Sequence, residues 1–338
     1  MKKIISLILV FASLFTVLAF AGSSAEAASL TSYYYEQRQQ FNANYSFSGG
    51  GFYGNVSYFV SDSTDADWDT PCRRLYVKTS INGKSKLVTG NVPYWKYSIY
   101  KNYIYYVYNH YIVKCAVNGK YKKAIIRRVG TEDIIPTNNR LFFITQKNYV
   151  YGSEAGLHVC DLNGKGYKTI LKGDVGGCYS WGSKLYFYFY DAVNKLMCYN
   201  MKTGKLSTIK SLSNQYSPVA MDGKYYYVTQ GLNRGRNIYR IDTATKAMKK
   251  VAFAGDQYYL IAVAGGKIYA NVRASSVNSN YNFYYRYNPK TGKFVLLRAL
   301  SKNVTDEFSG IGFYKNKLVV NRYVNGNPTH AYYILDTV

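Results

Sequence analysis

Residues 222–228 read Asp-Gly-Lys-Tyr-Tyr-Tyr-Val, a tight turn that runs directly into an apolar, aromatic strand. The same order, a turn with Gly, Asn or Asp and then a strand that opens on an aliphatic residue or Tyr, recurs along the chain. Gly, Asn and Asp favour turns because their backbones reach positive φ, whereas Tyr and Val favour extended backbone. The equivalent strands begin at Val56, Ile104, Leu141, Leu185, Tyr225, Ile268 and Leu318.

Most units continue with a further strand and a hairpin turn. Asn-Gly predicts a type I′ turn, in which both residues have positive φ. Later units replace this dipeptide with Thr-Gly or Thr-Lys, and a polar strand then ends each unit. The hairpin dipeptides stand at 82–83, 118–119, 163–164, 203–204, 245–246 and 291–292.

The spacing of these strands predicts the architecture. The units recur roughly every 40 residues or slightly more, which is the length of a four-stranded propeller blade. Tyrosine is abundant, with 40 residues, and helical periodicity is absent. We therefore expect an all-β fold, a β-propeller of about seven four-stranded blades, with six or eight as alternatives. The last unit ends on a third strand at 332–337, so we expect residues 30–47 to supply its fourth strand and close the ring.

The repeated motif is similar to that of a known propeller group. Residues 104–107 (Ile-Tyr-Tyr-Val), 112–114 (Ile-Val-Lys) and 118–119 (Asn-Gly) resemble the YWTD repeats of low-density-lipoprotein-receptor propellers. They resemble more closely the related bacterial secreted propellers of unknown function. The resemblance spans about residues 50–338 and implies the propeller fold. Tyr, Phe, Val or Ile stand where the receptors have Trp, Thr and Asp, so the receptors' ligands are not expected here.

The N-terminal residues have the three parts of a secretory signal peptide. Lys2 and Lys3 precede an apolar run at 4–21, and residues 25–27 (Ala-Glu-Ala) form a cleavage site. We expect residues 1–27 to be removed and residues 28–338 to form one propeller domain, secreted or associated with the cell wall. An uncleaved membrane anchor is the alternative, because the run approaches the length of a membrane-spanning helix.

The chain is strongly basic, with a formal net charge of +25. Such an excess attracts polyanions. For an exported monomer we expect an extracellular polyanion, glycan or protein as partner, with peripheral surface association as a further option and no role for nucleic acid. The alternative is that the charge only keeps a Tyr-rich chain soluble.

The cysteines are odd in number and lack C-x-x-C spacing, which argues against a zinc site or a disulfide framework. Cys115 and Cys160 occupy matching places, four residues before a turn glycine, and are expected to be small buried strand residues. The five are Cys72, Cys115, Cys160, Cys178 and Cys198.

A binding surface is expected on one face. In a four-stranded antiparallel blade, the loops between strands two and three share a face with the connectors between blades, and here they vary in length. Their aromatic and basic side chains suit an acidic glycan, through stacking and bidentate Arg contacts. The candidate binding residues are Trp68, Tyr149, Tyr151, Arg234, Arg236, Arg273, Tyr281 and Arg322.

One loop has the D-x-D-x-D spacing of a calcium site at Asp65, Asp67 and Asp69. No Gly follows Asp69, and Tyr76 stands where such a loop has Glu. A solvated acidic turn is therefore the alternative, and no other cofactor is expected.

Candidates for catalysis are few. His110, His158 and His330 fall in different blades, and His158 is expected to be a packed or edge residue of a strand rather than a ligand. Trp181, beside a turn, is expected in the core. Carboxylates for glycosidase chemistry would have to come from separate blades. Asp191, Asp306 and Glu307 are candidates, while residues 132–133 (Glu-Asp) read as a blade connector.

The sequence therefore favours a non-catalytic propeller with no assigned catalytic residue. Its strand 2–3 loop face would contact an anionic cell-wall polymer, glycan or protein. The alternative is a polysaccharide-active enzyme with carboxylates in the central channel.

Overall fold

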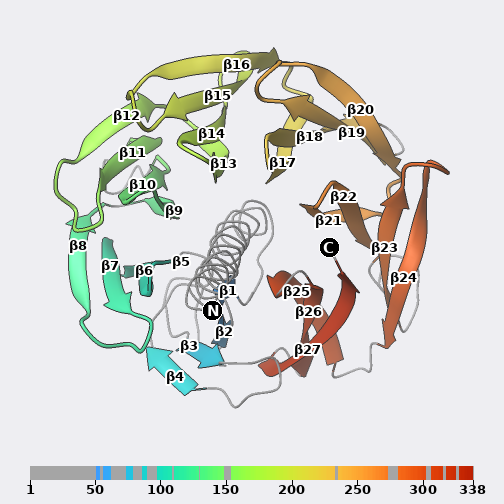
Figure 1. The fold of residues 1–338 in the computed structure, drawn as a ribbon, viewed down its shortest axis with the longest axis horizontal. Coiled ribbons are helices and arrows are strands. Elements are labelled where there is room, and N and C mark those ends of the chain that lie inside the picture. The colour runs from blue at the N-terminus through green and yellow to red at the C-terminus, as the bar shows by residue number, and fades with distance from the viewer. Residues whose placement is uncertain are drawn as a thin grey trace, which may run out of the picture.

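The computed structural model is a β-propeller whose seven sheets surround a central axis (Figure 1). It describes residues 51–53, 56–61, 74–78, 86–89, 97–108, 110–128, 130–147, 154–232, 235–272, 281–301, 306–314, 317–324 and 327–337. Six sheets have four antiparallel strands, and the last has three described strands. The predicted all-β fold and the count of seven blades are confirmed.

Each blade runs from an inner strand near the axis to an outer strand at the rim. The first three blades are β1 (Gly51–Tyr53), β2 (Val56–Ser61), β3 (Arg74–Lys78), β4 (Lys86–Thr89); β5 (Tyr97–Tyr100), β6 (Tyr103–Tyr108), β7 (Tyr111–Ala116), β8 (Lys123–Arg127); and β9 (Thr131–Thr137), β10 (Arg140–Thr145), β11 (Gly156–Asp161), β12 (Lys168–Lys172).

The remaining four blades continue around the ring in chain order. They are β13 (Val175–Trp181), β14 (Lys184–Phe189), β15 (Asn194–Asn200), β16 (Leu206–Leu212); β17 (Tyr216–Asp222), β18 (Tyr225–Leu232), β19 (Gly235–Asp242), β20 (Met248–Ala254); β21 (Tyr259–Ala264), β22 (Lys267–Val272), β23 (Tyr281–Asn288), β24 (Lys293–Ser301); and β25 (Asp306–Tyr314), β26 (Lys317–Val324), β27 (Asn327–Thr337).

The predicted strand starts coincide with the second strand of every blade. β2 and β18 begin at the predicted residue, and the other five begin one residue earlier. The first and last blades are neighbours, because β1 contacts β25. Residues 30–47, predicted to close the last blade, lie outside the described residues. The described residues also contain no apolar helix of membrane-spanning length.

The Asn-Gly turns differ from the prediction. At 118–119 and 163–164 only the glycine has positive φ, at 81° for Gly119 and 89° for Gly164. Gly119 N donates to Ala116 O at 2.8 Å, and Ala116 N donates to Lys120 O at 2.8 Å. The loop therefore has three residues instead of the two of a type I′ hairpin. Only its glycine has a backbone in the left-handed region. Paired positive φ angles occur instead in the turn between strands one and two, as at Asn138 (47°) and Asn139 (59°).

Every described outer strand bulges at one aliphatic residue. The pairing with the third strand skips a single position in each of the first six blades. A bulge re-aims a side chain, and four of these residues pack against the buried clusters. The otherwise polar outer strands are thereby anchored to the core. The skipped residues are Val88, Ile125, Ile170, Ile209, Val251 and Leu297.

Tyrosines fill much of the core and connect the blades. Tyr179 and Tyr188 are fully buried, and a buried hydroxyl needs a partner. Tyr188 Oη donates to Tyr216 O at 2.7 Å, and Tyr179 Oη donates to Val219 O at 3.2 Å. Both acceptors belong to β17 of the next blade, so these tyrosines pin adjacent sheets together.

Two expectations about single residues have different outcomes. Cys115 and Cys160 are free and buried as predicted, and burial raises the pKa of Cys115 to about 11 and that of Cys160 to about 12. Trp181 is not in the core. Its side chain is 40% exposed at the end of β13, because the adjoining turn at Gly182 carries it to the edge of the sheet.

Candidate functional site

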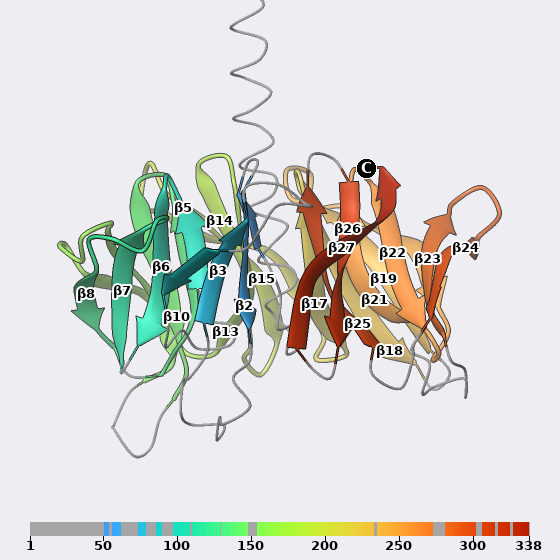
Figure 2. The ribbon, with the colours of Figure 1, turned by 90° about the horizontal axis from the view of Figure 1, so that it is seen from below.

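The propeller has two distinct faces. Asp174 O, in the connector before β13, accepts a hydrogen bond from Tyr190 N in the β14–β15 loop, and Gly130 O accepts one from Gln146 N in the same way. Connectors and strand 2–3 loops therefore share one side, the loop face, as the sequence predicts. The strand 1–2 and 3–4 turns form the opposite side, the turn face. The turn face is uppermost in Figure 2, where the C-terminal end of β27 lies.

The structure places few of the predicted binding residues. Tyr281 is the first residue of β23 and Arg322 lies in β26, but their side chains are not described. Arg236 is half-buried near the loop-face end of β19, where its backbone pairs with Gly231 and Ala254. The other candidates lie outside the described residues, and their roles remain predictions. These are Trp68, Tyr149, Tyr151, Arg234 and Arg273 for binding and Asp65, Asp67 and Asp69 for calcium.

Carboxylates gather where the inner strands begin, at the loop face. Glu132 and Asp133 follow the first residue of β9, and Asp174 directly precedes β13. Asp256 comes just before β21, while β25 opens with Asp306 and Glu307. The side chains of Glu132, Asp174 and Asp256 are exposed. We call this set, contributed by four blades, the inner-strand carboxylates.

The sequence predicts a blade connector at Glu132 and Asp133, and the structure corrects this. They lie inside β9, where Asp133 pairs with Ile144 and Thr131 pairs with Thr145, so Glu132 is skipped as a bulge. A bulge turns its side chain out of the regular alternation. The signal that sequence reasoning missed is the acidic residue at or before the start of four inner strands, β9, β13, β21 and β25.

Asp191, a candidate carboxylate for catalysis, forms an ion pair with Lys195. It lies in the β14–β15 loop, one residue after Tyr190, and its Oδ2 is 3.1 Å from Lys195 Nζ. Hydrogen bonds from Ala192 N and Lys195 hold the pKa of Asp191 below its usual range. The Asp191 carboxylate therefore stays ionised and paired with Lys195.

Two of the inner-strand carboxylates act on nearby tyrosines, of which Tyr179 is fully buried and Tyr190 is 40% exposed. Burial raises the pKa of Tyr179, and the charge of Asp133 raises it further. Burial and then Asp174 act in the same direction on the pKa of Tyr190. Both tyrosines therefore stay protonated and neutral, and the Tyr179 hydroxyl donates its hydrogen to Val219 O.

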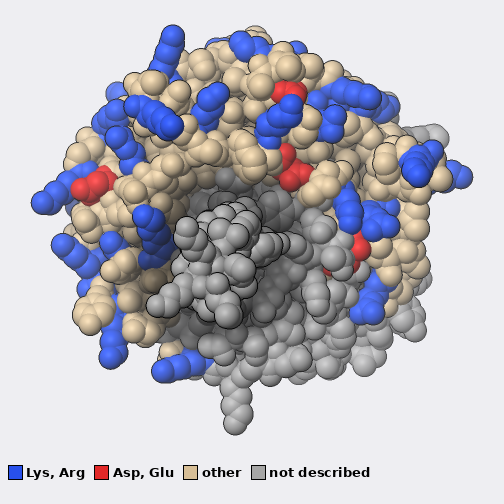
Figure 3. Space-filling model, viewed as in Figure 1, with Lys and Arg blue, Asp and Glu red and all other residues tan. Residues whose placement is uncertain are grey.

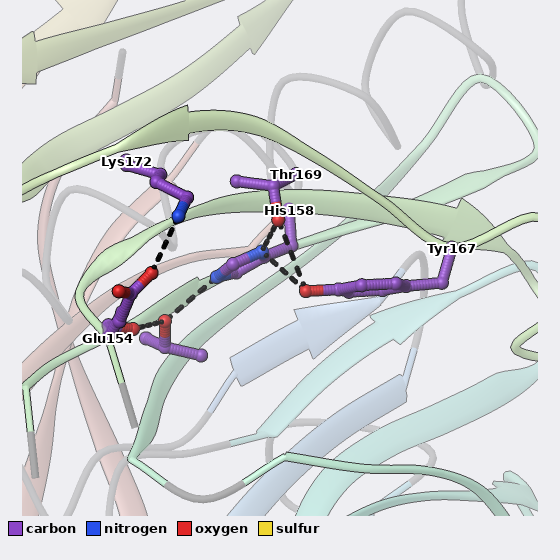
Figure 4. A network of polar contacts seen from close by, with 6 residues as sticks. Glu154, His158, Tyr167, Thr169 and Lys172 are labelled. Carbon is purple, nitrogen blue, oxygen red and sulfur yellow. Dashed lines mark hydrogen bonds and ion pairs between the residues drawn. The ribbon is translucent and has the colours of Figure 1, made fainter. Parts of the chain in front are cut away.

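A second polar cluster surrounds His158 in β11 (Figure 4). Thr145 Oγ1 is 2.8 Å from His158 Nε2 and also donates to Glu154 O at 2.8 Å. Because the threonine hydrogen is used on Glu154, Nε2 must carry the imidazole proton. The acceptor Nδ1 lies 3.0 Å from Tyr167 Oη and 3.1 Å from Thr169 Oγ1.

The surroundings of His158 make it a poor base at neutral pH. The side chain is 7% exposed. Burial, and then the positive charge of Arg128, lowers the pKa of His158 to about 4. An efficient general base has a pKa near the working pH. The prediction of a packed strand histidine is therefore confirmed, and its partners give it the function of orienting Tyr167 and Thr145.

Aromatic stacking completes this cluster in the seam between the second and third blades. The His158 ring lies 5.2 Å from Phe143 and 5.6 Å from Tyr167. The Arg128 guanidinium lies 3.9 Å from the Tyr167 ring centre. The nearby ion pair between Lys172 and Glu154 is exposed on both sides and contributes little. The cluster has the character of a packed seam rather than of a reactive centre.

Solved structures similar to this chain are β-propeller proteins. Oligogalacturonate lyase from Vibrio parahaemolyticus matches with a TM-score of 0.57 at 14% identity, over 85% of this chain and 98% of that chain. An oligogalacturonate lyase in complex with manganese matches with a TM-score of 0.58 at 13% identity, over 91% and 89%. A puromycin hydrolase matches with a TM-score of 0.60 at 10% identity, over 90% of this chain and 55% of the hydrolase. No protein-family model and no curated protein matches.

At these identities the likeness shows the β-propeller fold. The chain spans about half the length of the peptidases that it matches. These neighbours are enzymes, which overturns the expectation of a non-catalytic binding propeller. The enzymatic alternative is the better supported of the two interpretations.

Proposed function

We propose that this chain is a polysaccharide-active enzyme that works at the inner-strand carboxylates. The observation that carries the proposal is the extent of the likeness to an oligogalacturonate lyase, which covers 85% of this chain and 98% of the lyase. The peptidase matches cover 55% or less of those enzymes. A propeller that matches almost end to end offers the closer functional analogy.

The geometry supports the proposal in one respect. Glycan cleavage requires groups that remove and deliver protons at the scissile bond. The inner-strand carboxylates come from four blades and share the loop face, so they are arranged around the axis rather than along one strand. Glu132 and Asp174, on adjacent blades and both exposed, are the members on which we base the test.

Two reaction types produce different products from the same bond. In elimination, a base takes the proton beside the sugar carboxylate and the glycosidic oxygen leaves, which creates a carbon–carbon double bond. In hydrolysis, water enters and no double bond forms. The name of the lyase neighbours favours elimination, on a substrate with a carboxylate on its sugars.

No step of this proposal passes through a metal. One neighbour holds manganese, but in the described part of this chain no three His, Cys, Asp or Glu side chains are grouped to hold an ion. Kinship with YWTD propellers, secretion and processing at residue 27 also remain proposals. They rest on the repeated motif and on the N-terminal sequence.

The test incubates the full-length chain, produced with its own N-terminal segment, with polygalacturonate, alginate, hyaluronate and neutral galactan. New reducing ends together with ultraviolet absorbance of a conjugated double bond would show elimination, and reducing ends alone would show hydrolysis. If none of the four polymers yields either product, the proposal is wrong.

Variants then locate the activity. Glu132→Gln and Asp174→Asn are each expected to lower the rate roughly 100-fold, the usual effect of removing a general acid or base. Asp191→Asn is the matched control, since it removes a loop-face carboxylate that is already paired with Lys195 and should change the rate less than about two-fold. Equal losses in all three variants would refute the assignment.

A further inference from the structure

The turn face carries exposed cations from the second blade to the sixth. In each turn between strands three and four of these blades, a lysine either follows the turn glycine or replaces it. Further cations lie in the turns between strands one and two. Figure 3 views this face, and its Lys and Arg side chains surround the described part of the ring while Asp and Glu are sparse. We call this set the lysine crown: Lys120, Lys165, Lys205, Lys246 and Lys293 in the former turns, and Arg140, Lys184 and Lys224 in the latter.

The turns do not need these side chains in order to form. Asp161 Oδ1 accepts hydrogen bonds from Asn163 N at 2.8 Å and from Lys165 N at 2.9 Å, so Lys165 contributes only its backbone. Lys246 has a φ of 62°, in the left-handed region that Gly204 occupies in the preceding blade at 72°. A lysine there is less favourable than glycine. Turn geometry therefore leaves the cationic side chains unexplained.

The carboxylates of this face are used within the fold. Asp222 Oδ2 accepts a hydrogen bond of 2.6 Å from Gly266 N of the next blade. Asp242 caps its turn and pairs with Lys224 at 2.8 Å, and Asp336 pairs with Arg286 at 3.0 Å. The described part of the turn face is left with a surplus of positive charge. On the loop face, Lys172 and Lys195 likewise have carboxylate partners.

Aromatic rings stand among these cations. Trp181 is 40% exposed, and its ring lies against Gly223 of the next blade, where an added Cβ would be 3.6 Å from it. Tyr121, beside Lys120, is 81% exposed. Flat aromatic faces present apolar surface to the faces of sugar rings, and neighbouring cations attract charged groups on the same chain.

We propose that the lysine crown binds an acidic polysaccharide chain and holds it on the face opposite the inner-strand carboxylates. The inference rests on the proposed function for the class of polymer. Cations that recur from blade to blade match a linear chain with a carboxylate on each sugar. Several weak contacts along one chain act together, because each bound sugar keeps the next one near its cation.

The experiment measures binding of polygalacturonate to the full-length protein that carries Glu132→Gln, so that turnover does not consume the probe. The crown variant combines Lys165→Gln, Lys184→Gln, Lys205→Gln and Lys246→Gln. The matched control combines Arg127→Gln, Lys210→Gln, Lys250→Gln and Arg298→Gln on the outer strands, with the same loss of charge. Thermal unfolding verifies that both variants fold.

We expect the crown variant to raise the Kd for polygalacturonate about thirty-fold and the control to raise it less than about three-fold, with both effects screened by salt. Trp181→Ala should weaken binding as well. Equal effects of the two variants, or none, would overturn the proposal. So would binding to phosphatidylglycerol vesicles but not to polygalacturonate. Crown-dependent binding, together with no cleavage product from the wild-type chain, would refute the proposed function and leave the crown assignment intact.

Discussion

The hydroxyl of Tyr226 donates a hydrogen bond of 2.6 Å to the carbonyl oxygen of Gly177 in the neighbouring blade. Both residues are buried. Gly177 has a φ of 52° and lies where the pairing of β13 with β14 shifts register. This bulge turns the carbonyl group toward the next sheet, so backbone irregularity and a buried tyrosine together join the fourth and fifth blades.

Gly177→Ala should therefore destabilise the propeller strongly. An added Cβ would lie 2.5 Å from Pro218 Cβ and 2.6 Å from Tyr226 Oη, besides the left-handed φ. We expect the free energy of unfolding to fall by about 3–5 kcal/mol, measured by urea denaturation. Gly182→Ala is the control, because its φ of 58° is similar and nothing lies within 4 Å of an added Cβ. That variant should lose only about 1 kcal/mol. Similar losses in both would contradict the packing argument.

The repeat made most of this fold predictable. Turn signals followed by apolar strands recur in register, so strand starts such as Leu185 were located to within one residue. The bulges were not predictable, because skipping Ile170 or Glu132 depends on pairing across strands rather than on local sequence. The prediction of a type I′ turn at Asn118 is wrong for the same reason. The hydrogen bond that closes the hairpin sets the number of residues in the loop, and this bond joins the two sides of the hairpin.

Asp336 provides a second link between blades, from the seventh to the sixth. Its Oδ2 accepts hydrogen bonds from Tyr269 Oη and Arg286 Nη1, both at 3.0 Å. Tyr269 is fully buried, so Asp336→Ala removes the acceptor of a buried hydroxyl and should cost about 2–3 kcal/mol. Thermal unfolding measures this loss. Lys224→Gln, which breaks the pair with Asp242 but leaves no buried hydroxyl without its acceptor, should leave the melting temperature unchanged, and an equal shift in the two variants would disprove the distinction.

The described cysteines should resist modification in the folded protein. Burial raises the pKa values of Cys115, Cys160, Cys178 and Cys198, so the reactive thiolate is scarce at neutral pH. In a Cys72→Ser background, a thiol reagent should label none of the four before unfolding and all four in denaturant. Mass spectrometry counts the labels. Rapid labelling of any one under native conditions would show that its strand opens readily.

The site was less predictable than the fold. A site forms where separate blades converge, and sequence shows each blade alone. Asp133 and Asp174 carried a usable signal, an acid at the start of an inner strand. The sequence instead predicts binding residues in the variable loops, and most of those residues lie outside the described part of the chain. The lysines of the hairpin turns were visible as a repeat, but only topology places them on the face opposite the loops.

His158 predicts how stability depends on pH. Burial and Arg128 lower its folded pKa to about 4, against roughly 6.5 in an unfolded chain. Between these values the unfolded chain binds the extra proton, so stability is full above pH 6.5 and falls as the pH drops toward 4, by on the order of 3 kcal/mol. His158→Gln should remove this component, whereas Tyr167→Phe, which keeps the imidazole buried, should retain it. Urea denaturation at a series of pH values gives the comparison, and parallel profiles for the wild type and His158→Gln would show that the imidazole is not held neutral.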